Sequence, residues 1–171
     1  MIYLIPMGTV DPEILEAIKQ PLENTFGYRV QIGNSIPIPE DSWDKPRRQH
    51  LASRLLARLP SPPLRDDRVL GIVDIDIFAH GLNFVFGEAD ITGKRALISL
   101  QRLRPEFYDI PPGDNLFLER ILKEAIHELG HNYGLEHCPN PACAMHFSNS
   151  LQDTDLKKRS FCPDCQSKLK I

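Results

Sequence analysis

Residues 127–137, His-Glu-Leu-Gly-His-Asn-Tyr-Gly-Leu-Glu-His, hold the most informative pattern in the chain. On a helix, His127 and His131 lie one turn apart on the same face, so both imidazoles can bind one metal ion. Glu128 lies between them in sequence and can accept a proton from a water molecule at that ion. The spacing therefore predicts a zinc site on a helix, with a carboxylate placed for proton transfer.

His137 can join this site only if the helix ends before it. On a continuing helix it would lie about 15 Å along the axis from His127, because each residue rises by about 1.5 Å. Gly134 stands where helices commonly end in a left-handed residue. We expect a turn at Gly134 that brings His137 back as the third ligand. The alternative is a surface helix with three solvated histidines.

The motif lies at the end of a long predicted helix that begins at Asp114 or Asn115, since either residue can cap it. At about 100° per residue, the apolar side chains of this helix form one stripe, and His127 and His131 project from the opposite side. We expect the stripe to face the core and the histidines to face a cleft or solvent. The stripe consists of Leu118, Ile121, Leu122, Ala125 and Leu129.

All four cysteines follow this motif, at positions 138, 143, 162 and 165. The spacing C-x4-C…C-x2-C suits a closed tetrahedral zinc site, in which four thiolates leave no open position. Such a site would hold the irregular tail against the turn that carries His137, because zinc binding supplies folding free energy. An iron–sulfur centre, disulfides and four unlinked thiols are the alternatives.

The extended histidine motif resembles that of the metzincin clan of zinc peptidases, in which a methionine turn follows the third histidine; Met145 is placed to serve as that methionine. The cysteine pattern narrows the resemblance to the archaemetzincin family. It covers residues 127–165, and Gly81–Gly87 is also similar to that family. The resemblance implies two zinc ions per chain: a catalytic ion bound by His127, His131 and His137, with Glu128 as general base, and a structural ion bound by Cys138, Cys143, Cys162 and Cys165.

Phe147 departs from the pattern of other metzincins, which often have a tyrosine two residues after the methionine. Because phenylalanine cannot donate a hydrogen bond, any oxyanion stabilisation must come from zinc or from another group. His146 is available, but as a lone residue beside the turn it is treated as incidental.

Upstream of the motif, short strand-like runs alternate with helical ones, which predicts an α/β (α+β) fold. The predicted strands are 2–7, 27–32, 69–78, 83–86 and 96–100, and the predicted helices are one that starts at Pro12 and one over 41–59. The resemblance implies a metzincin-like mixed twisted sheet with packed helices, a long active-site helix ending at a glycine turn, and a small zinc-finger-like C-terminal element built on the four cysteines. We expect a single domain over 1–171, in which 1–126 form the platform and 127–171 hold every metal ligand.

The composition limits the classes of partner. With 171 residues, 42% of them hydrophobic, and a formal net charge of −3, the chain is typical of one globular domain and lacks the positive field that would attract nucleic acid or an anionic membrane. No apolar run is long enough to cross a bilayer, and the first residues do not resemble a signal peptide. We therefore expect a cytoplasmic monomer that binds neither nucleic acid nor membrane.

The leading hypothesis is a metzincin-type zinc metallopeptidase (EC 3.4) that acts on peptides or proteins. Asn83–Phe86 is a candidate strand for pairing with the substrate backbone. The rival is a catalytically silent or latent zinc protein that acts as a binding or regulatory module. The intact Glu128 favours the peptidase, because a structural metal site has no need of it. A four-cysteine finger that binds nucleic acid is a weaker third hypothesis, since the tail lacks basic residues interleaved with aromatic ones.

Other charged groups are interpreted as structural. Asp74 and Asp76 share one face of a predicted strand, which indicates hydrogen-bonded or solvated carboxylates rather than a catalytic pair. The run Lys157-Lys158-Arg159 is typical of a solvated helix face. We assign no role to His50 or His80.

Overall fold

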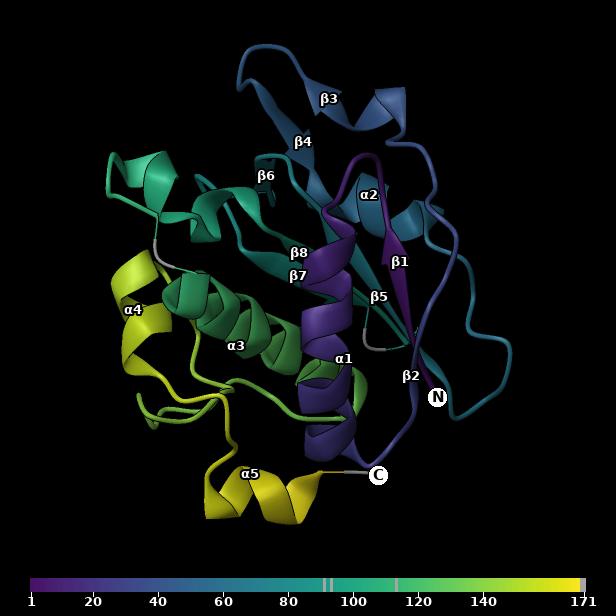
Figure 1. Cartoon of the computed structure of the whole chain (residues 1–171), viewed down its shortest axis with the longest axis vertical. Coiled ribbons are helices and arrows are strands. Elements are labelled where there is room, and N and C mark those ends of the chain that lie inside the picture. Colours follow the sequence, from purple (N-terminus) through teal and green to yellow (C-terminus); the bar gives the residue numbers. More distant parts are fainter. Residues whose placement is uncertain (91, 93, 113, 170–171) are drawn as a thin grey trace.

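A five-stranded sheet with the strand order β2-β1-β5-β8-β7 forms the centre of the chain (Figure 1). In this computed structural model, residues 1–90, 92, 94–112 and 114–169 are described. Neighbouring strands run parallel except at one edge, where β7 is antiparallel to β8. The strands are β1 (Ile2–Pro6), β2 (Val30–Ile32), β5 (Arg68–Val73), β7 (Gly87–Asp90) and β8 (Arg95–Ser99).

Helices cover both faces of this sheet (Figure 1). Alternate side chains of the central strand β5 point to opposite faces, as a strand requires. Leu70 and Ile72 pack against α1 (Pro12–Phe26) and α3 (Asp114–Asn132), whereas Val69 and Val73 pack against α2 (Ala52–Arg58). Burial on both faces explains the nearly continuous apolar run in β5. The structure thus confirms the predicted mixed α/β fold.

The first helix begins at Pro12, as predicted. The Asp11 side chain accepts a hydrogen bond from the backbone N–H of Glu13, and Gly27 ends α1 with a left-handed φ of 72°. Pro21 lies inside the helix and does not end it. Because Gly27 terminates α1, the predicted strand over 27–32 is shorter than expected and begins at Val30.

The predicted helix over 41–59 is wrong in its first half. Residues Glu40–Ser42 form a short 3-10 helix (η1), and β3 (Trp43–Asp44) pairs with β4 (Gln49–Leu51) before α2 begins. The Asp44 side chain accepts a hydrogen bond from the backbone N–H of Arg47, which closes a turn around Pro46 in place of a helix. Only the apolar positions from Ala52 onward are helical.

The long strand predicted over 69–78 divides between two sheets. β5 ends at Val73, and β6 (Ile77–Phe78) joins a second, three-stranded sheet with the order β3-β4-β6. The carboxylates between them form ion pairs, Asp74 with Arg104 at 2.5 Å and Asp76 with Arg102 at 2.6 Å. The structural interpretation of these two carboxylates is therefore confirmed.

The predicted strand over 83–86 is also wrong. This segment is irregular, and the strand begins one residue later, at Gly87. Side chains from the β3–β4 hairpin hold it in place: Arg47 donates to the carbonyl oxygens of Leu82 and Asn83, and Gln49 donates to that of Asn83. In a β-strand, these carbonyl oxygens would accept hydrogen bonds from the backbone of a neighbouring strand. Here they accept hydrogen bonds from side chains instead.

After β8, two short 3-10 helices, η2 (Gln101–Leu103) and η3 (Pro105–Tyr108), lead toward α3. Two short helices, α4 (Leu151–Leu156) and α5 (Pro163–Lys168), complete the fold, and α4 packs against α3. Among the described residues, no helix is both long and apolar enough to span a bilayer.

Candidate metal centre

The predicted turn at Gly134 is present. Helix α3 ends at Asn132, Gly134 adopts a left-handed φ of 89°, and the N–H of Leu135 donates to the carbonyl oxygen of Gly130. This pattern satisfies carbonyl groups at the helix end while the chain reverses direction. His137 consequently returns to the face that carries His127 and His131. The ring centroid of His137 lies 4.8 Å from that of His131 and 5.3 Å from that of His127.

The hydrogen bonds of the first two histidines orient their rings for metal binding. His127 Nδ1 contacts the carbonyl oxygen of Ala144 at 2.9 Å, and His131 Nδ1 contacts that of Leu135 at 2.8 Å. Since a carbonyl can only accept, both Nδ1 atoms carry the proton and both Nε2 atoms are left with a lone pair. The two Nε2 atoms are 3.2 Å apart. Nitrogen ligands at about 2.0–2.1 Å from one zinc ion stand about 3.3 Å apart, so this spacing fits a shared ion.

The environment keeps these imidazoles neutral, as metal ligands must be. Burial lowers the pKa of His127 well below its ordinary value, and the positive charge of Lys157 adds to the shift. Burial also lowers the pKa of His131 and of His137. Both helix histidines face a cleft, as expected, because His127 and His131 line the same cavity. His127 is buried at its base, His131 is half-buried and His137 is exposed.

Met145 lies buried next to the helix that carries the motif. The Met145 sulfur lies against Gly130 of α3. A Cβ atom at residue 130 would collide with this sulfur, so the helix needs a glycine there. The carbonyl oxygen of Met145 accepts a hydrogen bond from the N–H of Cys138 at 2.9 Å. The turn at residues 144–145 therefore supports both the His127 ring, through Ala144, and the segment that carries His137.

Glu128 stands at the wall of a cleft with a cavity of about 160 Å³. Burial raises the pKa of Glu128 well above its usual range, and the nearby Glu124 carboxylate adds to the shift while Lys157 opposes it. Gly87 of β7 lies so close that a Cβ atom there would stand 2.7 Å from Glu128 Oε1. A second cavity, of about 320 Å³, is lined by Glu128 together with all three histidines. The carboxylate and the candidate metal ligands thus share one opening.

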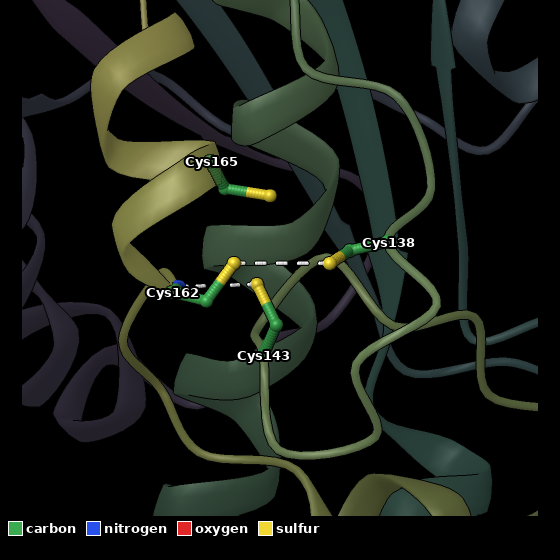
Figure 2. Close-up of side chains that lie close together, drawn as sticks. All are labelled: Cys138, Cys143, Cys162 and Cys165. Carbon is green, nitrogen blue, oxygen red and sulfur yellow. Dashed lines mark hydrogen bonds between the residues drawn. The ribbon is translucent and has the colours of Figure 1, made fainter.

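The side chains of Cys138, Cys143, Cys162 and Cys165 point toward one another and form a second cluster of possible metal ligands (Figure 2). Cys138 and Cys143 come from the loop after α3, and Cys162 and Cys165 come from the start of α5. Their sulfur atoms all lie within 4.8 Å of one another, and those of Cys138 and Cys162 are 3.8 Å apart. Thiolates at about 2.3 Å from one zinc ion stand about 3.8 Å apart at the corners of a tetrahedron, so the donors fit that ion.

Two of these thiols differ in acidity. A hydrogen bond from the backbone N–H of Cys165 lowers the pKa of the Cys162 thiol to about 7, whereas burial raises the pKa of the Cys143 thiol. All four are free cysteines rather than disulfides. Because metals bind the deprotonated form of cysteine, the lowered pKa of Cys162 favours metal binding at this cluster.

Comparison with known proteins identifies the family. Residues 22–171 match the model of peptidase family M54. The chain belongs to peptidase family M54. Archaemetzincin from Methanocaldococcus jannaschii is 48% identical over 168 residues, which cover 98% of this chain and 92% of that protein, and archaemetzincin from Pyrococcus furiosus is 47% identical over 177 residues, which cover 99% and 92%. Membership of M54 makes this chain a zinc metallopeptidase, and the resemblance to archaemetzincins is confirmed.

Solved structures similar to this chain share its fold over nearly the whole chain. A crystal structure of archaemetzincin from Archaeoglobus fulgidus, complexed with malonate, is 38% identical with a TM-score of 0.86, and the match covers 99% of this chain and all of that one. A zinc-dependent peptidase from Methanocorpusculum labreanum is 27% identical with a TM-score of 0.88, over 98% and 99% of the two chains. The fold described above is therefore shared with these solved structures over nearly the whole chain.

The prediction that Lys157 lies on a solvated helix face is wrong. Lys157 follows α4 and is fully buried, with its ammonium group 3.0 Å from the Glu124 carboxylate, whereas Lys158 and Arg159 are exposed. A run of three basic residues carries no signal that its first member is internal. The Ser150-x-x-Asp153 capping box, which begins α4, is the one local clue that a short helix ends just before Lys157.

Proposed function

We propose that His127, His131 and His137 bind the catalytic zinc ion and that Glu128 is the general base in metzincin-type hydrolysis of peptide bonds (EC 3.4). The observation that carries this proposal is the pair of unprotonated Nε2 atoms 3.2 Å apart, beside a carboxylate in the same opening. Zinc in this site would supply a Lewis acid that polarises the scissile carbonyl and lowers the pKa of water.

Glu128 moves the proton in this scheme. Its carboxylate accepts a proton from the attacking water molecule and then donates it to the nitrogen of the leaving amine. The apolar surroundings of Glu128, which raise its pKa, favour a group that can hold a proton between these two steps. Phe147 packs against the His137 ring, with the centroids 4.9 Å apart, so it holds that ring without taking part in proton transfer.

The substrate backbone is proposed to pair with β7 rather than with residues 83–86. β7 is the last strand of the five-stranded sheet, so its outer edge carries backbone groups that a peptide in extended form can bind. Gly87 places this edge directly against Glu128. An added strand would therefore pass the scissile bond across the face of the metal centre.

Cys138, Cys143, Cys162 and Cys165 are proposed to bind a second, structural zinc ion, which makes two per chain. The 3.8 Å separation of two of their sulfur atoms supports this assignment. Free thiols arranged for a metal also support a reducing, cytoplasmic compartment. The ion would link α5 to the loop that carries Met145.

Cleavage of an unbiased peptide library tests the catalytic proposal. We expect the zinc-loaded wild type to cleave peptides in the library, to lose this activity when a chelator removes the more accessible ion, and to recover it when zinc is added back. Mass spectrometry of the products measures the cleavage. A protein that is fully loaded with zinc and cuts no peptide would contradict the proposal.

Elemental analysis tests the second ion. We expect two zinc ions per wild-type chain and one in the Cys162→Ser/Cys165→Ser variant, because two of the four thiolates are lost. The double variant should also unfold at a lower temperature, since zinc binding contributes free energy to folding. Ser167→Ala, an exposed change in the same helix, is the matched control. Equal zinc content in wild type and double variant would overturn this assignment.

A further inference from the structure

The cavity beside Glu128 has an apolar wall and a charged floor. Phe84, Val85, Phe86 and Phe147 line it, and Glu124 lies one helical turn before Glu128. The ring centroids of Phe84 and Phe86 are 5.2 Å apart in an edge-to-face contact, which gives the wall a defined shape. The cavity is large enough for one side chain of a peptide bound across the metal centre.

The Glu124 carboxylate at this floor is already paired from behind. Lys157 is completely buried and its Nζ atom lies 3.0 Å from Glu124 Oε1, an oxygen that also accepts a hydrogen bond from the Thr154 hydroxyl at 2.8 Å. Lys157 Nζ also donates to the carbonyl oxygen of His146 at 3.4 Å. No hydrogen bond to the second oxygen, Oε2, is found within the described part of the chain.

The net charge of the Glu124–Lys157 pair determines which substrate side chains this end of the cavity can bind. A buried carboxylate without a partner is strongly unfavourable and draws any available cation. In a substrate pocket that cation would be the side chain of a lysine or arginine. Here the ammonium group of Lys157 takes that position from within the protein, so the floor has no net charge.

We propose that Lys157 determines the specificity of this pocket: by neutralising Glu124, it makes the pocket accept an uncharged, apolar side chain next to the scissile bond and reject a basic one. The inference rests on the proposed peptidase function and concerns the same cleft. Lys157 does not touch the reacting atoms, and its effect on side-chain preference runs through its ion pair with Glu124. Its charge also acts on Glu128 and the histidines, so the preference is measured as a ratio between substrates, in which a common change in rate cancels. A peptide with leucine or phenylalanine at this position packs against the aromatic wall, whereas a basic side chain would lose its hydration without gaining a partner.

Two single substitutions test this proposal, because each removes one charge of the ion pair and should shift the substrate preference in the opposite direction. Lys157→Met leaves the carboxylate unpaired, so we expect the preference for Lys or Arg over Leu, measured as a ratio of kcat/KM values, to rise at least tenfold. Glu124→Gln leaves the ammonium group unpaired and should instead raise the preference for Asp or Glu by a similar factor. The Glu124→Gln/Lys157→Met double variant should regain the wild-type order, and Lys158→Met, a change at the exposed neighbour, should not alter it.

Binding measurements separate this inference from the proposed function. The same peptides are titrated against each variant in a Glu128→Gln background, where side-chain preference appears as a ratio of Kd values without cleavage. Circular dichroism and thermal melting show which variants fold, and either folded single variant suffices as the test. Cleavage by the wild type with an unchanged preference in a folded single variant would overturn the role of Lys157 alone. Absence of cleavage, with the expected shifts in Kd, would overturn the catalytic proposal and support the pocket.

Discussion

Glu128→Gln is expected to lower kcat/KM for peptide cleavage by about 10²–10⁴-fold, the range typical of a lost general base. Glutamine has the same shape as glutamate but cannot accept the proton of the attacking water. The substitution should leave the zinc content unchanged, because Glu128 is not among the residues whose donor atoms converge at the candidate metal site. Rates on a peptide that the wild type cleaves, together with elemental analysis of both proteins, measure the effect.

Glu136→Gln is the matched control for this experiment. It makes the same chemical change within the same motif, but its side chain is exposed and does not line the shared opening of the metal centre. We expect wild-type rates for it. If Glu128→Gln instead retained full activity with zinc bound, another carboxylate would have to move the proton, and Glu124 and Glu88, which also lie near Glu128, would be the groups to replace next.

The candidate site could be predicted from the sequence because its signals are local. Two histidines four residues apart share a helix face by helical geometry alone, and Gly134 is the kind of residue that ends a helix in a left-handed turn. The cysteine spacing likewise matches known zinc sites. These inferences need no knowledge of what lies elsewhere in the fold.

The errors arose where distant residues decide local structure. Residues 83–86 have the composition of a strand, but Arg47 and Gln49 bind their neighbouring carbonyl groups. Lys157 looks like one of three surface charges, and only the position of Glu124, 33 residues earlier, explains its burial. Helical periodicity also could not indicate that α3 is buried around His127 as well as along its apolar stripe, because α4 and the tail supply that cover.

Gly87→Ala is expected to impair both stability and catalysis, because a side chain at this position in β7 would collide with Glu128 of α3. An added Cβ atom would stand 2.6 Å from the carbonyl oxygen of Leu97 and 2.6 Å from Glu128 Cγ. The first is backbone within the β7–β8 pair and cannot move alone, so the unfolding free energy should fall by about 1–3 kcal/mol, as in an overpacked core. The second displaces the proposed general base, and a shift of about 1 Å can cost about 10²-fold in rate.

Gly81→Ala separates these effects from the general cost of replacing a glycine in this region. Gly81 has a left-handed φ of 83° but no atom within 4 Å of the added Cβ, so its replacement should cost about 1 kcal/mol of stability through backbone strain alone. Its kcat/KM should match the wild type, whereas that of Gly87→Ala should not. Urea denaturation and rates on one cleaved peptide measure both quantities. Full activity in a folded Gly87→Ala protein would mean that β7 can move away from Glu128 without consequence, which would contradict the proposal that this edge presents the scissile bond to the metal centre.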